Sequence, residues 1–182
     1  MKKCNLLLPA SIAIALVSGT AMAGESNHVI GGNFVMGNVD ERLGGQPEED
    51  DGYSSFDVYY RYLFDSHFGL ELGYMNAGSV GMGSRNDNSV YQRSEGIRIA
   101  GVGQYSLSQR NSLYAKAGLA HFNVDYNSII GESGEQSTTG FYSAAGWQYR
   151  FDFGLGLNVE YQYIPVDDFK VRGVAIGASY RF

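Results

Sequence analysis

Apolar and polar residues alternate with a period of two along most of this chain. In residues 54–64, Phe56 and Val58 share one face, whereas Asp57 and Arg61 share the other. Successive side chains of a β-strand point to opposite sides of the sheet, so the pattern predicts strands with one apolar face. Eight runs show it, at residues 27–37, 54–64, 67–76, 93–106, 113–126, 139–151, 155–165 and 171–182. The sequence therefore predicts an all-β protein.

The length of these runs suits a membrane. A tilted strand of ~10 residues crosses a bilayer, and a sheet in lipid has to close because its edge groups would otherwise stay unpaired. Eight is an even number and the smallest strand count among single-chain outer-membrane barrels. We therefore predict an eight-stranded antiparallel transmembrane β-barrel with up-and-down topology. A soluble β-barrel or β-sandwich that buries the same aromatic residues is the alternative.

The connections between the runs alternate in length. Short turns of outer-membrane barrels face the periplasm and long loops face outward. This rule predicts that both ends of the mature chain lie in the periplasm and that a shorter fourth outer loop spans 166–170. The short connections are 65–66, 108–112 and 152–154, and the long ones are 38–53, 77–92 and 127–138.

The N-terminal residues predict export. Two lysines precede an apolar stretch that ends in Ala21-Met22-Ala23, which is the pattern of a secretory signal peptide. We predict a signal peptide at 1–23 and one barrel domain at 24–182. The only cysteine, Cys4, lies within the signal and has no small-residue lipobox before it, which argues against a lipoprotein.

The last run alternates up to the terminal residue. This pattern resembles the C-terminal assembly signal of outer-membrane proteins, and the resemblance implies that Ile176, Tyr180 and Phe182 are recognised by the barrel assembly machinery. By length, strand count and terminal strand, residues 27–182 resemble the small outer-membrane barrels of the OmpA transmembrane-domain and OmpX/Ail type. The chain stops at the barrel, so the resemblance does not extend to the peptidoglycan-binding role of full-length OmpA.

Charged residues fall on the faces opposite lipid. An eight-stranded barrel leaves room inside for side chains and little else, so these residues are predicted to pair with one another as structural contacts. Three acids would serve five bases, and the excess bases would need water or other polar partners. A small-ion path gated by rearranging pairs is the alternative. The predicted interior charge network comprises Asp57, Arg61, Glu71, Arg98, Lys116, Arg150, Glu160 and Arg181.

The predicted outer side carries charges of both signs. The loop 38–53 holds six acidic residues and one arginine, but without the spacing of a calcium loop, so we predict no metal site and no cofactor. The formal net charge of −6 makes nucleic acid an unfavourable partner. Four basic residues at the outer rim are either contacts for lipopolysaccharide phosphates or solvated charges: Arg85, Arg93, Lys170 and Arg172.

The sequence gives little support for catalysis. His121 is the only histidine near the predicted outer leaflet, and no serine follows at the strand spacing of lipid A deacylase barrels. Its face is ambiguous, which suggests a bulge. We predict no enzymatic activity and a structural role in the envelope. The alternative is a surface adhesin or host-interaction barrel that binds through its outer loops, where Ile129 and Ile130 form an apolar tip or fold back.

Overall fold

The computed structural model of the protein describes residues 26–41, 51–78, 93–127, 133–166 and 169–182. The predicted signal peptide at 1–23 lies outside these residues, as do 42–50 of the predicted acidic loop and Ile129 and Ile130. No helix among the described residues is long and apolar enough to cross a membrane.

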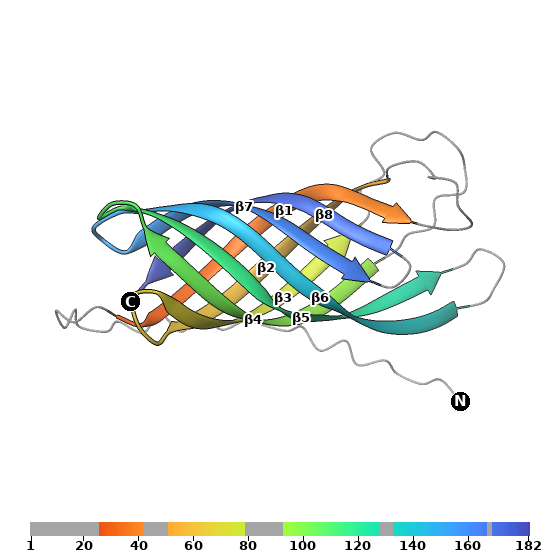
Figure 1. Ribbon diagram of the computed structural model, residues 1–182. Coiled ribbons are helices and arrows are strands. Elements are labelled where there is room, and N and C mark those ends of the chain that lie inside the picture. Colours follow the sequence, from red (N-terminus) through yellow and green to blue (C-terminus); the bar gives the residue numbers. More distant parts are fainter. Residues whose placement is uncertain (1–25, 42–50, 79–92, 128–132, 167–168) are drawn as a thin grey trace, which may run out of the picture.

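Eight antiparallel strands form one closed barrel in chain order (Figure 1). Each strand pairs with its sequence neighbours, and β1 pairs with β8 to close the sheet. The predicted eight-stranded up-and-down barrel is thus confirmed. The strands are β1 (His28–Glu41), β2 (Asp51–Leu63), β3 (Phe68–Gly78), β4 (Arg93–Ser106), β5 (Asn111–Asn127), β6 (Ser133–Arg150), β7 (Leu155–Val166) and β8 (Phe169–Arg181).

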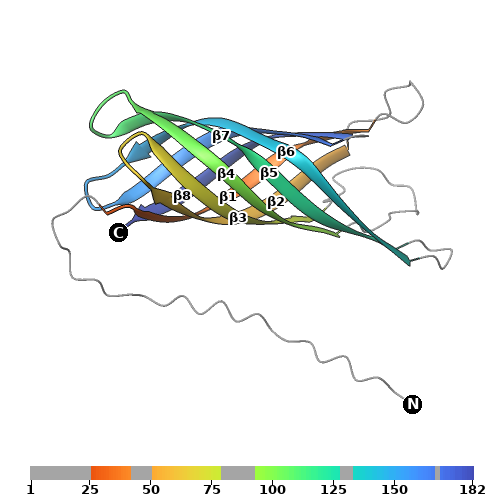
Figure 2. The ribbon, with the colours of Figure 1, turned by 60° about the horizontal axis from the view of Figure 1, so that its bottom comes forward.

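The two ends of the barrel differ. The described turns that join β2 to β3, β4 to β5 and β6 to β7 lie at one end, together with the start of β1 and the C-terminus (Figures 1 and 2). We call this the turn end. The strand ends that flank the segments 42–50, 79–92, 128–132 and 167–168 lie at the opposite end, which we call the loop end.

The turns are held by local hydrogen bonds. The Asp65 carboxylate accepts hydrogen bonds from the backbone N–H groups of His67 and Phe68, at 2.6 and 2.8 Å. In the turn between β6 and β7, Gly154 has a φ of 95°, which residues with a side chain rarely adopt. Its carbonyl oxygen accepts a hydrogen bond from the Arg181 N–H at 3.0 Å, so the glycine turn is also tied to β8.

Strand boundaries differ from the prediction mainly at the loop end. The predicted loop 127–138 is wrong in length because β5 continues to Asn127 and β6 already begins at Ser133. Residues 133–138 carry no large apolar side chain, so no alternation marks them. Where a hairpin extends beyond the lipid, its strands stay paired through backbone hydrogen bonds and need no apolar face. The hydrophobic pattern therefore underestimates the length of the hairpin.

The barrel is apolar outside and mixed inside. On β2, Phe56, Val58 and Tyr60 are exposed on the outer face, whereas Asp57, Tyr59 and Arg61 are buried. Two apolar clusters also lie inside. One groups Val29, Tyr59 and Leu63 toward the turn end, and the other groups Met75, Ala100, Ala120, Tyr142, Ala144 and Ile164, with Phe122 and Val171 packed against it. Charged side chains share the interior with them.

Candidate functional site

Glu71 is at the centre of the interior charges. Its Oε2 accepts two hydrogen bonds from Arg61, from Nε at 2.9 Å and from Nη2 at 2.7 Å. Its Oε1 accepts a hydrogen bond from Arg98 Nη2 at 2.9 Å and lies 2.9 Å from Lys116 Nζ. One fully buried carboxylate on β3 thus meets three cations from β2, β4 and β5.

Two further acids extend this centre. Arg98 Nη1 donates to Asp57 Oδ2, and Lys116 Nζ lies 2.8 Å from Glu160 Oε2. Acids and bases therefore alternate along a continuous path through the lumen. All six side chains are at most 3% exposed. We call this set the inner network: Asp57, Arg61, Glu71, Arg98, Lys116 and Glu160.

Neutral groups complete the inner network. The Tyr114 hydroxyl and the Gln162 amide each donate to Glu160, both at 2.7 Å. The Asn33 amide donates to Asp57 Oδ1 at 3.0 Å. The Arg98 guanidinium lies 4.9 Å from the centre of the Tyr142 ring, a cation–π distance. The alternation that places Asp57, Lys116 and Arg150 inside also places Tyr59, Tyr114 and Tyr142 inside. Which charged group each tyrosine contacts depends on the strand register, which the sequence does not give.

Arg150 and Arg181 are not part of the inner network. Arg150 donates to the Gly154 carbonyl at 3.1 Å and to the Gln148 side chain at 2.9 Å, and Arg181 Nε donates to the Ser26 carbonyl. Both are half-buried at the turn end. The three acids thus pair with three of the five predicted bases, and these two excess bases bind neutral polar groups. The pairing does not follow from the sequence, because the phase of a strand gives the face of a side chain but not its depth in the barrel.

The predicted assembly residues share the outer face of the closing strand. Ile176, Tyr180 and Phe182 are each about half exposed. The Phe182 ring stacks on His28 at 5.9 Å and on Tyr180 at 6.4 Å, and its backbone N–H donates to the His28 carbonyl at 3.0 Å. The C-terminal aromatic group is therefore anchored across the seam between β1 and β8.

His121 lies on the outer face, and the suggested bulge is absent there. The pairing of β4 with β5 runs without interruption from Arg93↔Asp125 to Ser106↔Ser112, so Phe122 faces inward. His121 Nδ1 is 2.8 Å from Thr139 Oγ1 on β6. Thr139 lies on the neighbouring strand, so only the register His121↔Thr139 reveals this contact.

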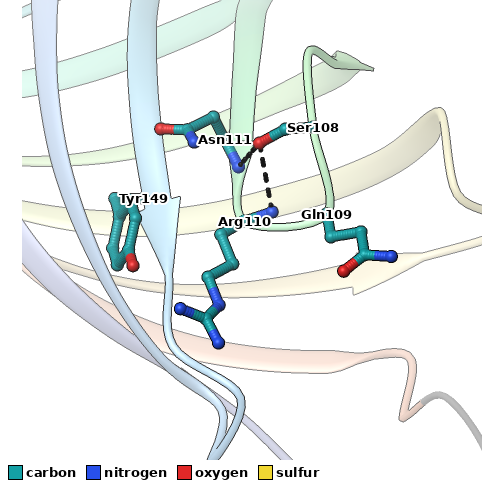
Figure 3. A pocket seen from close by; sticks show the side chains of 5 residues that line it. All are labelled: Ser108, Gln109, Arg110, Asn111 and Tyr149. Atoms are coloured by element: carbon teal, nitrogen blue, oxygen red, sulfur yellow. Dashed lines mark hydrogen bonds between the residues drawn. The ribbon is translucent and has the colours of Figure 1, made fainter.

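The turn end contains a shallow polar hollow of about 420 Å³ (Figure 3). It is lined by Ser108, Gln109, Arg110, Asn111 and Tyr149. Arg110 forms a bidentate pair with Asp152, from Nε to Oδ1 at 3.1 Å and from Nη2 to Oδ2 at 2.6 Å. These hydrogen bonds, and one with Tyr149, raise the pKa of Arg110 above its ordinary value. Sequence reasoning missed this pair because its partners come from different turns.

Among the predicted basic rim residues, the structure places Lys170 and Arg172 on β8 at the loop end. The side chain of Arg93 and all of Arg85 lie outside the described part of the chain. Within the described residues, no group of three or more histidine, cysteine, aspartate or glutamate side chains is arranged to bind a metal ion.

A family model, the outer membrane protein beta-barrel domain, matches residues 10–182. This chain belongs to that family. It is an outer-membrane β-barrel protein, and the predicted family and the outer membrane as its location are confirmed. The attachment invasion locus protein of Yersinia pseudotuberculosis serotype I (strain IP32953) is 24% identical over 194 residues, which cover 98% of this chain and 97% of that protein.

Solved outer-membrane barrels share the fold. The crystal structure of Ail, the attachment invasion locus protein of Yersinia pestis, has a TM-score of 0.63 at 23% identity and covers 87% of this chain and 100% of Ail. Ail in complex with the heparin analogue sucrose octasulfate gives 0.65 at 24% identity, with the same coverage. Neisserial surface protein A gives 0.69 at 14% identity, covering 87% of this chain and 99% of that protein.

Proposed function

We propose that this outer-membrane barrel has a structural role in the envelope and that side chains fill its interior, so that it is not a wide porin. The observation that carries the proposal is the inner network, in which three acids alternate with three bases at no more than 3% exposure. The interior of an eight-stranded barrel is just wide enough for side chains. The two apolar clusters that share the interior with the network support the same conclusion.

Energetics favour a closed interior. Breaking a buried ion pair by loss of one partner costs about 3–5 kcal/mol, because it leaves an uncompensated charge. A water-filled path would have to separate several pairs at once, since Glu71 alone holds three cations. The network is therefore best explained as a set of contacts that stabilises the barrel.

Conductance across planar bilayers tests whether side chains fill the interior. We expect the folded wild-type barrel to carry no steady current, with a porin in the same bilayer as the positive control. A steady current through wild-type barrels would reject the filled interior. Brief currents whose frequency rises in Glu71→Gln would favour the alternative of a small-ion path through rearranging pairs.

The proposal includes an orientation. The signal peptide at 1–23 is removed on export, the turn end faces the periplasm with both mature termini, and the barrel assembly machinery reads Ile176, Tyr180 and Phe182. The short described turns and the outward aromatic face of β8 support it. Because Cys4 is the only cysteine, single cysteines at Glu48 and Gln109 can be labelled with an impermeant maleimide in whole cells. We expect labelling of the cysteine at position 48 and not of the one at position 109. The opposite result would show that the turn end faces outward.

A second candidate function is surface binding through the loop end. The resemblance to the attachment invasion locus protein favours it, and Ail has been crystallised with a heparin analogue. Lys170 and Arg172 are the described cations at that end and would meet sulfate or lipopolysaccharide phosphate groups. Retention of the wild-type barrel on immobilised heparin, and its loss in Lys170→Gln with Arg172→Gln, would establish this function. Equal retention of both proteins would reject it.

Enzymatic activity is not part of the proposal. The contact between His121 and Thr139 lies within an uninterrupted ladder of β4, β5 and β6, whose backbone N–H groups are engaged between the strands. Acyl transfer needs hydrogen-bond donors that stabilise an oxyanion, and these paired N–H groups are not free to serve as such donors. We expect Thr139→Ala to leave the mass spectrum of lipid A unchanged, and a shift by the mass of one acyl chain would contradict this.

A further inference from the structure

An aromatic ladder leads along β6 into the turn end. Trp147, Tyr149, Phe151 and Phe153 follow one another on the same face, with ring centres 6.4, 4.9 and 5.4 Å apart. Trp147 is 41% exposed and Phe153 65% exposed. Aromatic side chains of this kind gather where acyl chains give way to headgroups. The ladder therefore marks the depth of the lipid interface on this side of the barrel.

The pair of Arg110 and Asp152 lies beside the ladder at headgroup depth. Both side chains are at least half exposed, and Arg110 comes from the turn after β4 whereas Asp152 comes from the turn after β6. An exposed ion pair adds little to stability because water competes for both charges, so the fold gains little from it. What the pair presents to the surroundings is one fixed cation next to one fixed anion.

The polar hollow is adjacent to this pair. Ser108 Oγ is occupied within the turn, where it accepts hydrogen bonds from the backbone N–H groups of Asn111 and Arg110, at 3.1 and 3.4 Å (Figure 3). The Asn111 side chain donates to the same oxygen at 2.9 Å. The bidentate pair uses two of the five N–H groups of Arg110, and the hydrogen bond with Tyr149 uses a third. The guanidinium therefore keeps donors for a further anion, next to the Gln109 amide that also lines the hollow.

We propose that this hollow, together with the adjoining Asp152, binds the headgroup of a phospholipid that carries a primary ammonium, such as phosphatidylethanolamine. The phosphate would lie on Arg110 in the hollow, the ammonium on Asp152 beside it and the acyl chains along the aromatic ladder. The guanidinium fork matches phosphate oxygens, and a carboxylate accepts from an ammonium group. A purely anionic headgroup would meet repulsion from Asp152. A quaternary ammonium has no N–H to donate to it.

The assignment to the phospholipid leaflet rests on the proposed orientation, in which the turn end faces the periplasm. The lipid contact itself can be measured without knowing the orientation, because vesicles can have the same lipid in both leaflets. Trp147 is the only tryptophan of the chain and lies on the ladder, so its fluorescence reports lipids at this site.

The experiment uses the folded barrel in three preparations of phosphatidylcholine vesicles. Each contains the same small fraction of one brominated lipid, with an ethanolamine, a glycerol or a choline headgroup. We expect the ethanolamine lipid to associate about threefold more strongly than the choline lipid, as judged by quenching of Trp147, which is the size of one exposed ionic contact. Arg110→Gln and Asp152→Asn should each abolish this preference, so that the two lipids quench about equally. Asp65→Asn removes a carboxylate from another turn at the same end and should keep it.

Three results would overturn the proposal. Equal quenching by all three headgroups would make the ladder a general interfacial anchor. Stronger quenching by the glycerol lipid would indicate a site for anionic lipid. An ethanolamine preference that persists in both Arg110→Gln and Asp152→Asn would place its origin elsewhere. Failure of the orientation is a separate outcome, since it appears in the maleimide labelling and leaves the quenching unchanged.

Discussion

The interior and the lipid-facing surface of this barrel are built by the same strands but follow different rules. On β3, the buried Glu71 has three charged partners at defined distances, whereas its neighbour Leu72 is 53% exposed on the outer face and meets lipid. Any apolar side chain of similar size satisfies lipid, but only a matching charge satisfies Glu71. The outer face therefore requires only that its side chains are apolar, whereas the inner face requires particular charged partners.

The largest effect is expected at the centre of the inner network. Glu71→Gln leaves Arg61, Arg98 and Lys116 without their shared carboxylate, so we expect the free energy of unfolding to fall by about 3–5 kcal/mol. Urea unfolding of the barrel in detergent measures it. Leu72→Val is the matched control on the outer face, with a small expected change. Equal losses for both variants would contradict the difference between the two faces.

Substitutions on the outer face should lower the free energy of unfolding when they introduce a charge, but not when they only change the shape of an apolar side chain. Leu72→Arg places a cation against lipid within β3 and is expected to cost ~2–4 kcal/mol, as at the middle of a bilayer. Leu107→Arg, in the turn between β4 and β5, should cost only about 0–1 kcal/mol at the interface. Unfolding in vesicles compares the two variants. A cost at Leu107 that matches Leu72 would show that depth in the membrane is not the cause.

The smallest effect is expected in the turn after β2, outside both faces. The two backbone N–H groups that bond Asp65 lower its pKa below the ordinary 3.8. A carboxyl whose pKa is lower in the folded state stabilises the fold above its unfolded pKa and loses this contribution as the pH falls through the folded pKa. The turn should therefore be unaffected between pH 7 and about pH 5 and loosen only in stronger acid.

Hydrogen exchange of the His67 and Phe68 amides follows this turn. Protection should decrease in acid for the wild type, after correction for intrinsic exchange rates. Asp65→Asn should lack this pH-dependent step. An identical pH profile in the two proteins would show that the carboxylate does not hold the turn.

The difference between the faces also explains what the sequence could predict. The alternation of apolar and polar residues correctly places Asp57 and Arg61 inside, because it reports which side of a strand a residue occupies. It reports nothing more. It cannot give the contact of Glu71 on β3 with Lys116 on β5, since β4 lies between these strands and only the closed barrel brings the side chains together.

The features that the sequence did not specify have the same origin. Arg150 and Arg181 have the inward phase but lie at the turn end, where carbonyl groups and Gln148 bind them instead of acids. The pairs Arg110 with Asp152 and His121 with Thr139 join residues of different turns or strands, and only the register specifies them. Residues 133–138 extend β6 without any apolar pattern because they need no lipid-facing side.

A double-mutant cycle on Lys116 and Glu160 tests the central claim most directly, since their 2.8 Å contact is one of the pairs that make up the inner network. The unfolding free energies of Lys116→Met, Glu160→Gln and the double variant give the coupling between the two side chains. We expect the double variant to be more stable than the sum of the single losses predicts, by about 1–3 kcal/mol. Losses that add to within ~0.5 kcal/mol would mean that these side chains do not act together, and would contradict an interior held by paired charges.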